Sequence, residues 1–230
     1  MEVIAEIGVN HNGDSKLAVL MGNIASACGV DVVKFQYFNA DELEKVRNVE
    51  STALHKLEIL PSKFIGIQTL LNSLSSELMF SYFTKHSLDV GINCFKYAKV
   101  KVPADFLVRD VSVLYNDKVH YISFRKEQWN DLKTKCIKEL KKKKCMLTVS
   151  KYPATFEDYD LSILEEMKTK GIRFGVSDHT TNNRLAIKAK ELGAYCIEKH
   201  FTLDRNQEGA DHHMSIEPKE LVELVNICKG

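Results

Sequence analysis

The chain has no Cys-x-x-Cys spacing, although cysteines occur at positions 28, 94, 136, 145, 196 and 228. Most of them lie inside apolar segments, which indicates buried free thiols in a reducing compartment and excludes a zinc knuckle or a disulfide framework. No apolar run approaches the ~20 residues that span a bilayer. The first residues enter a strand pattern at once, at Val3-Ile4-Ala5, which leaves no room for a signal peptide. We therefore expect a cytoplasmic protein without a membrane partner.

The sequence also lacks a strong charge of either sign, because 32 Lys and Arg stand against 31 Asp and Glu. This balance argues against a nucleic acid as the main partner. The one strongly basic run, 138–144, is typical of a solvated helix end. No Pro/Gly/Ser-rich linker and no internal repeat divides the 230 residues, so we expect a single domain over 1–230.

What the sequence does contain is an alternation of short apolar runs with helical patterns. Asp14-Ser15 and Glu217-Pro218 are expected helix starts, and Gly29, Gly171 and Gly193 follow expected helix ends. The expected helices are 15–28, 61–77, 103–110, 126–142, 160–170, 181–192 and 217–228, with a very short crossover at 84–90. The expected strands are 3–7, 31–36, 79–83, 92–98, 118–123, 144–149, 172–176 and 194–199.

Eight strands separated by helical connections predict an α/β fold of the (β/α)8 TIM barrel type, and a doubly wound open sheet is the competing fold. In a barrel, the polar residues that interrupt the apolar runs should gather at the carboxyl ends of the strands. The sequence meets this expectation at all eight strand ends, with Glu6, Lys34, Gln36, Ser81, Lys96, Ser123, Ser150, Tyr152, His179 and His200.

Two histidines follow successive strands near the end of the chain, in Ser177-Asp178-His179-Thr180 and in Glu198-Lys199-His200. Asp211-His212-His213 lies in the next loop, and imidazole and carboxylate groups of this kind are typical of a divalent metal site. Lys34 and Lys96 interrupt apolar strands, where an ammonium group is costly without an anion.

At this point the sequence resembles the N-acetylneuraminate (sialic acid) synthase family, over nearly the whole chain and in the order of the family's motifs. The resembling segments are Ile4-Ala5-Glu6-Ile7-Gly8, Asn10-His11-Asn12-Gly13, Val33-Lys34-Phe35-Gln36, Ser150-Lys151-Tyr152-Pro153, Ser177-Asp178-His179-Thr180, Glu198-Lys199-His200-Phe201-Thr202-Leu203-Asp204-Arg205 and Gly209-Ala210-Asp211-His212.

The resemblance implies a catalytic barrel that condenses phosphoenolpyruvate with the open-chain aldehyde of an N-acetylhexosamine, giving a nonulosonic (sialic-type) acid and phosphate. It implies a divalent metal, Mn²⁺ above Mg²⁺ or Co²⁺, on His179 and His200, with Asp211 holding a substrate hydroxyl or a water at the metal. Glu6, Glu198 and Asp211 would carry the catalysis. The substrates would contact Lys34, Gln36, Ser81, Lys96, Ser123, Ser150, Tyr152 and Ser177.

The sequence departs from the family at four places. Lys96-Tyr97-Ala98-Lys99-Val100-Lys101 stands for the family's Lys-Ile-Ala-Ser-Gly-Glu, and Ser123-Phe124-Arg125-Lys126 stands for Ser-Thr-Gly-Met. Lys151 replaces an asparagine. The 230 residues do not include the family's antifreeze-like C-terminal domain, which in the family lends an arginine to the partner subunit's sugar site. A homodimer or a separate partner chain that supplies this domain is therefore an open expectation.

Lys99, Lys101, Arg125 and Lys151 are all cationic, and we expect them near one mouth of the barrel, where they would suit a phosphorylated or otherwise anionic acceptor. A catalytically weakened or inactive paralogue or subunit that binds phosphoenolpyruvate or a similar anion is the alternative. A Schiff-base aldolase, with Lys96 or Lys199 as the amine, is a second enzymatic alternative.

Overall fold

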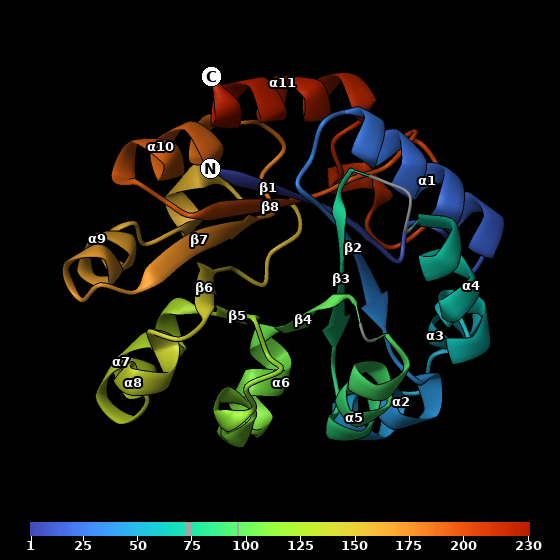
Figure 1. The fold of residues 1–230 in the computed structure, drawn as a ribbon, viewed down its shortest axis with the longest axis horizontal. Helices are drawn as coiled ribbons and strands as arrows, with labels where there is room; N and C mark the ends of the chain where they lie inside the picture. The colour runs from blue at the N-terminus through green and yellow to red at the C-terminus, as the bar shows by residue number, and fades with distance from the viewer. Residues whose placement is uncertain (72–74, 96) are drawn as a thin grey trace.

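The computed structural model describes residues 1–71, 75–95 and 97–230, and its eight parallel strands close into a barrel in which each strand pairs with its neighbours in chain order (Figure 1). This confirms the predicted (β/α)8 barrel and excludes the open sheet. The strands are β1 (Glu2–Gly8), β2 (Val32–Tyr37), β3 (Glu77–Tyr82), β4 (Lys99–Val102), β5 (Tyr121–Phe124), β6 (Lys144–Leu147), β7 (Arg173–Asp178) and β8 (Cys196–His200).

The helices lie around the outside of the barrel, and α11 returns to pack beside α10 and β1 (Figure 1). Short 3₁₀ turns occur at Val111–Tyr115, Phe156–Asp158 and His212–Met214. The helices are α1 (Ser15–Ala27), α2 (Ala40–Arg47), α3 (Thr52–Leu57), α4 (Pro61–Leu71), α5 (Lys85–Cys94), α6 (Ala104–Arg109), α7 (Lys126–Lys135), α8 (Ile137–Leu140), α9 (Ser162–Thr169), α10 (Arg184–Leu192) and α11 (Pro218–Lys229).

Local chemistry sets several helix boundaries where the sequence predicts them. The Asp14 side chain accepts hydrogen bonds from the backbone N–H groups of residues 16 and 17 and so caps α1. Pro218 occupies the first turn of α11, where its missing N–H costs nothing. Gly193 ends α10 with φ +89°, a left-handed conformation that favours glycine.

The prediction of a fourth strand over 92–98 is wrong. The Thr84 side chain accepts a hydrogen bond from the Ser87 N–H and starts α5, so 85–94 is a full helix where only a short crossover was expected. Phe95 then packs into the layer between helices and barrel, stacked on Phe80 at 4.6 Å between ring centroids. The strand follows at Lys99–Val102, where every second residue is a lysine.

Three other expectations differ from the structure in extent. The long connection from β2 to β3 contains two short helices, α2 and α3, that the sequence pattern did not predict. The single helix expected over 126–142 is divided into α7 and α8, because the chain leaves the helical conformation at Cys136. The helix expected over 61–77 is α4, Pro61–Leu71, and residue 77 already begins β3. The other strands and helices lie within a few residues of their predicted positions.

The barrel interior is apolar at its amino end and polar at its carboxyl end. A plug of six buried side chains fills the lower layer, and the residue two positions later on a strand points to the same side. That step leads from Ile4 to Glu6, from Val32 to Lys34 and from Cys196 to Glu198. The plug consists of Ile4, Val32, Met79, Tyr121, Met146 and Cys196.

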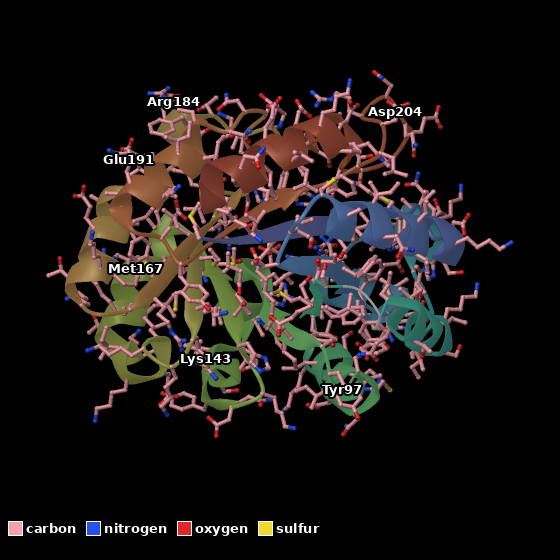
Figure 2. The ribbon with its side chains drawn as sticks, turned by 45° about the horizontal axis from the view of Figure 1, so that its top comes forward. Tyr97, Lys143, Met167, Arg184, Glu191 and Asp204 are labelled. Atoms are coloured by element: carbon pink, nitrogen blue, oxygen red, sulfur yellow. The ribbon has the colours of Figure 1, made fainter. Side chains whose placement is uncertain are left out.

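The outer surface shows the expected division between buried apolar and exposed charged residues. Met167 of α9 is fully buried against the barrel, whereas the Arg184 and Glu191 side chains of α10 are more than half exposed (Figure 2). The six cysteines are free thiols, as the sequence predicts. Among the described residues, no helix combines the length and the apolarity needed to cross a membrane.

Candidate functional site

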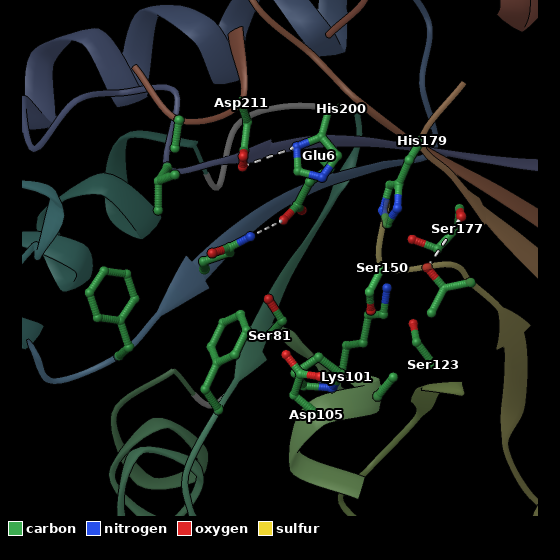
Figure 3. A pocket seen from close by; sticks show the side chains of 18 of the residues that line it. Glu6, Ser81, Lys101, Asp105, Ser123, Ser150, Ser177, His179, His200 and Asp211 are labelled. Atoms are coloured by element: carbon green, nitrogen blue, oxygen red, sulfur yellow. Dashed lines mark hydrogen bonds and ion pairs between the residues drawn. The ribbon is translucent and has the colours of Figure 1, made fainter. Parts of the chain in front are cut away.

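One cavity of about 660 Å³ opens at the carboxyl end of the barrel (Figure 3). Lys96 lies outside the described residues, so the structure does not place it. The cavity is lined by all twelve other residues that the sequence proposes for the site, namely Glu6, Lys34, Gln36, Ser81, Ser123, Ser150, Tyr152, Ser177, His179, Glu198, His200 and Asp211.

The floor of the cavity is a buried cluster of four charges, formed by Glu6, Lys34, Lys101 and Glu198. Lys101 Nζ donates to both Glu198 oxygens, at 2.6 and 2.7 Å, and Lys34 Nζ lies 2.7 Å from Glu198 Oε2. Lys34 Nζ also lies 3.1 Å from Glu6 Oε2. These side chains are at most 4% exposed, so two ammonium groups and two carboxylates balance one another away from water.

The pKa values of the four groups shift in different directions, because burial and neighbouring charges act on each group to a different extent. Burial raises the pKa of Glu6 to about 7, against the opposing effect of Lys34. Burial would also raise the pKa of Glu198, but Lys101 and Lys34 together hold it well below its ordinary value. Burial lowers the pKa of Lys101 to about 8, whereas for Lys34 the attraction of Glu198 and Glu6 overcomes burial and raises the pKa. Glu198 is therefore the fixed anion of the cluster, and Glu6 is the group that can exchange a proton near neutral pH.

The strand β4 brings Lys101 into the cavity, and the sequence interpretation missed this role. Residue 96 precedes β4, which begins at Lys99. If the family's Lys-Ile run is placed on the strand, it falls on Lys101-Val102, five residues later than the sequence comparison assumed. The alternation of lysine and valine over 99–102 is the signal that could have placed the strand correctly.

The two predicted metal-ligating histidines lie beside each other in the cavity, at the ends of the neighbouring strands β7 and β8, with ring centroids 5.5 Å apart. His179 Nδ1 lies 2.7 Å from the Val149 carbonyl oxygen. Since a carbonyl can only accept, Nδ1 carries the proton and Nε2 is left with a free lone pair. His200 Nδ1 is buried without a hydrogen-bond partner among the described residues. Burial lowers the pKa of His179 to about 4 and that of His200 well below its ordinary value, so both rings are neutral, the form that binds metals.

Asp211 and Tyr152 complete this side of the cavity. Asp211 Oδ2 lies 3.5 Å from His200 Nδ1, and burial raises the pKa of Asp211. The Tyr152 ring lies 4.3 Å from the His179 ring, centroid to centroid. A neutral histidine pair with an unpartnered buried nitrogen and a nearby carboxylate fits a divalent cation. Among the described residues, the ligand atoms of His179, His200 and Asp211 do not all lie within 4.8 Å of one another.

Asp178 and Lys199, which precede the two histidines in sequence, form an ion pair that links β7 to β8. Lys199 Nζ donates to Asp178 Oδ2 at 2.8 Å and to the carbonyl oxygens of Thr180 and Asn182 at 2.7 and 2.9 Å. Lys199 is 1% exposed and does not line the cavity. These hydrogen bonds occupy the ammonium group, which argues against Lys199 as the amine of a Schiff-base aldolase.

The hydroxyl and amide groups of the site fall into two sets. Ser177 Oγ donates to Glu198 Oε1 at 2.8 Å, and Gln36 Nε2 donates to Glu6 Oε1 at 3.3 Å, so both support the charged cluster. Ser123 Oγ is buried and unpartnered among the described residues, which leaves it available to a ligand. Ser150 lies nearer the rim, where its Oγ accepts from Arg125.

A glycine allows the polar groups from β1 and β2 to meet. Gly8 ends β1 with φ +57°, a left-handed conformation, and a β-bulge lies between Glu6 and Gly8. A Cβ at Gly8 would lie 3.1 Å from Glu6 Oε1 and 3.3 Å from Gln36 Nε2. The glycine therefore leaves room for the Glu6–Gln36 hydrogen bond.

The expectation that four additional cations lie near one mouth of the barrel is wrong for Lys99, and the other three lie at the carboxyl end in different settings. Lys99 lies at the opposite end of the barrel, where it pairs with Glu77 at the start of β3. Lys151 is exposed and pairs with Asp158, and Lys101 belongs to the buried cluster. Arg125 does line the cavity, and its Nη1 lies 2.5 Å from an Asp105 carboxylate oxygen.

The sequence interpretation also missed the outer wall of the cavity. Phe38 and Phe83, from the ends of β2 and β3, meet at 6.5 Å between ring centroids, edge to face. Leu43, Leu54 and Leu57 from the α2–α3 region extend this apolar wall. Arg47 and Arg109 lie at its edge.

Comparisons with known proteins agree with the geometry. A family model described as the NeuB family matches residues 21–229. N,N'-diacetyllegionaminic acid synthase of Campylobacter jejuni is 31% identical, over 95% of this chain and 72% of that protein. Human N-acetylneuraminate-9-phosphate synthase is 29% identical, over 97% of this chain and 68% of that protein.

Solved structures resemble the barrel along its whole length. The N-acetylneuraminic acid synthetase of Leptospira borgpetersenii, solved in complex with citrate, has a TM-score of 0.86 at 26% identity and covers 99% of this chain and 82% of its own. A truncated 3-deoxy-D-arabino-heptulosonate 7-phosphate synthase of Thermotoga maritima, with a TM-score of 0.67 at 12% identity over 98% of this chain and 84% of its own, shares the fold alone.

Proposed function

Because the chain belongs to the NeuB family, we propose that it condenses phosphoenolpyruvate with an N-acetylhexosamine-type aldehyde, giving a nonulosonic acid and phosphate. The observation that carries this proposal is the position of two buried lysines and two neutral histidines in one cavity at the carboxyl end of the barrel. Two lysines suit the anionic substrate, and two histidines suit a cation that activates the aldehyde.

Phosphoenolpyruvate would bind over the floor of the cavity. Lys34 and Lys101 would direct their ammonium groups at its phosphate and carboxylate, and the free Ser123 hydroxyl would donate to the phosphate. Glu198 keeps the two lysines charged and in place before the substrate arrives, because it already accepts hydrogen bonds from both. The site is thus preorganised for an anion, with little reorganisation needed on binding.

The metal expected here is Mn²⁺, with Mg²⁺ or Co²⁺ as alternatives, held by His179 and His200. When bound, it would supply a Lewis acid that polarises the aldehyde oxygen of the acceptor. Asp211 would accept a hydrogen bond from a water or acceptor hydroxyl beside His200, and Tyr152 would cover the His179 ring.

The reaction forms one carbon–carbon bond and releases phosphate. The enol carbon of phosphoenolpyruvate attacks the aldehyde carbon, and the aldehyde oxygen takes up a proton to become a hydroxyl. Water adds to the carbon that carries the phosphate, and the tetrahedral intermediate expels phosphate as its carbon–oxygen bond breaks, leaving the keto group. Glu6, with a pKa of about 7, is suited to take the proton from the attacking water. Gln36 holds its carboxylate by a hydrogen bond to Oε1.

The experiment that tests this proposal measures phosphate release from phosphoenolpyruvate with Mn²⁺, against a panel of N-acetylhexosamines and their 6-phosphates. Release that depends on one acceptor and stops on chelation is the expected result. Phosphoenolpyruvate binding without release under any condition would instead support the alternative, an inactive paralogue or a subunit that requires a partner chain.

The metal ligands are tested by His200→Ala, with His213→Ala as the matched control. His200 is buried in the cavity, whereas His213 is exposed two residues beyond Asp211. Calorimetry with Mn²⁺ should show a loss of tight binding in His200→Ala and an unchanged affinity in His213→Ala. Equal affinities in the two variants would remove His200 from the metal site.

A further inference from the structure

Two arginines meet at the outer edge of the cavity, although they are far apart in sequence. Arg47 ends α2, and its guanidinium carbon lies 5.6 Å from the centroid of the Phe83 ring. Arg109 ends α6, and its Nη2 donates to the Phe83 carbonyl oxygen at 2.7 Å. Both side chains line the cavity, so a single residue, Phe83, brings the two guanidinium groups to the same part of the rim.

Neither arginine has a carboxylate partner within ion-pair distance among the residues that the structure describes. Arg125, the third arginine of the cavity, differs because Asp105 neutralises it. Burial lowers the pKa of Arg109, Asp105 opposes this effect, and the like charge of Arg47 adds to it. Two adjacent guanidinium groups that have no carboxylate in ion-pair contact, with Asp105 acting on Arg109 only from farther away, are a site that an anion would stabilise.

The distribution of charge within the cavity indicates which of the two substrates would place an anionic group beside the two arginines. On the floor, Lys34 and Lys101 are already balanced by Glu6 and Glu198, and the proposed phosphoenolpyruvate would occupy that end. At the rim, no carboxylate of the described residues forms an ion pair with Arg47 or Arg109. The apolar wall of Phe38, Phe83, Leu43, Leu54 and Leu57 lines the same cavity.

We propose that Arg47 and Arg109 form an anion subsite that binds a phosphate or carboxylate group on the acceptor, at the end remote from its aldehyde. This inference rests on the proposed function for the identity of the acceptor. A phosphate suits the pair better than a carboxylate, because two guanidinium forks can bind its oxygens from two sides at once. The subsite would select anionic acceptors over neutral ones of the same sugar.

The test compares the binding of three acceptors by calorimetry, in the presence of Mn²⁺: an N-acetylhexosamine, its 6-phosphate and the corresponding 6-carboxylate. The 6-phosphate should bind about ten-fold more tightly than the neutral sugar, the effect of a partly exposed charge pair. Because the arginines are exposed, the preference should shrink in about 1 M salt, where the screening length is about 3 Å.

The variants Arg47→Met and Arg109→Met should each reduce the preference for the anionic acceptor to two-fold or less, whereas Arg47→Lys should retain part of it. Arg173→Met is the matched control, because Arg173 lies at the amino end of the barrel, at the start of β7. It should keep the full preference. A retained preference in both Met variants, or an equal affinity of the wild type for the neutral and anionic sugars, would overturn the proposal.

The outcome is separable from that of the proposed function. Phosphate release with a neutral acceptor and no preference for an anionic one would sustain the condensation and refute the subsite. A preference that both arginine variants abolish, without phosphate release under any condition, would sustain the subsite and refute the condensation. A preference for the 6-carboxylate alone would sustain the subsite and assign its ligand to the carboxylate class.

Discussion

The substitution Glu198→Gln tests the buried charge cluster most sharply, because Glu198 is the group on which the cluster depends. Its carboxylate accepts hydrogen bonds from Lys101 and from Ser177 and pairs with Lys34, all at 2.6 to 2.8 Å. Glutamine keeps the shape and removes the charge. Two buried ammonium groups would then share Glu6 as the nearest anion.

The loss of one partner from a buried ion pair costs about 3–5 kcal/mol, because the remaining charge stays buried without compensation. For a chain of 230 residues this corresponds to a fall in Tm of roughly 6–20 °C. The pKa of Glu198 is depressed in the folded state, so its contribution to stability is present at neutral pH and is lost as the pH falls below the ordinary value of 4.5. The difference between variant and wild type should therefore narrow in acid.

The assay is equilibrium urea unfolding, with chelator present, at pH 7 and at about pH 4. Glu191→Gln is the matched control, because Glu191 pairs with Lys188 on the exposed surface of α10, where a pair contributes less than about 1 kcal/mol. A loss below about 1 kcal/mol for Glu198→Gln at pH 7, or a loss that does not change with pH, would refute the reasoning.

Three further substitutions test other parts of the account. Burial raises the pKa of Glu6 in the folded state from 4.5 to about 7, so the folded state binds more protons than the unfolded state between these pH values. The free energy of unfolding of the wild type should therefore fall by up to about 3 kcal/mol as the pH rises across this range. In urea unfolding, Glu6→Gln should lack this pH-dependent fall, and the same fall in both proteins would contradict the assignment. In Gly91→Ala the added methyl group would lie 1.9 Å from the buried Tyr82 ring, which should cost about 1–3 kcal/mol by thermal unfolding, and an unaltered Tm would count against this packing. Lys199→Met should leave the Asp178 carboxylate buried and uncompensated, a loss of about 3–5 kcal/mol by the same method, and a neutral result would show that this pair does not hold β7 to β8.

The residues that the sequence alone could place are those in which a chemical type coincides with a strand end. Glu6, Lys34, His179 and His200 follow apolar runs that fold as strands, so their convergence on one cavity follows from the barrel itself. Lys101 was not predicted as a site residue, because the mostly apolar residues 92–95 resemble a strand in sequence and the fourth strand was placed there. They fold instead as the end of α5 and its cap, through a helix start at Thr84 and aromatic packing far away in sequence.

The two arginines at the rim of the cavity could not be predicted from sequence patterns, for a different reason. Arg47 and Arg109 each end a helix, where a cation is common because it interacts favourably with the helix dipole. Nothing local distinguishes them from other helix ends. Only the path of the chain past β3, which places Phe83 between them, brings the two guanidinium groups together.

The central claim, condensation rather than hydrolysis of phosphoenolpyruvate, is tested most directly by running the reaction in ¹⁸O-labelled water with Mn²⁺ and an N-acetylhexosamine acceptor. We expect phosphate to be released only when the acceptor is present, and to carry no label, because the carbon–oxygen bond breaks and water adds to carbon. Labelled phosphate would show that water attacks phosphorus, and release that does not depend on the acceptor would show hydrolysis without condensation. Either result would contradict the proposed reaction.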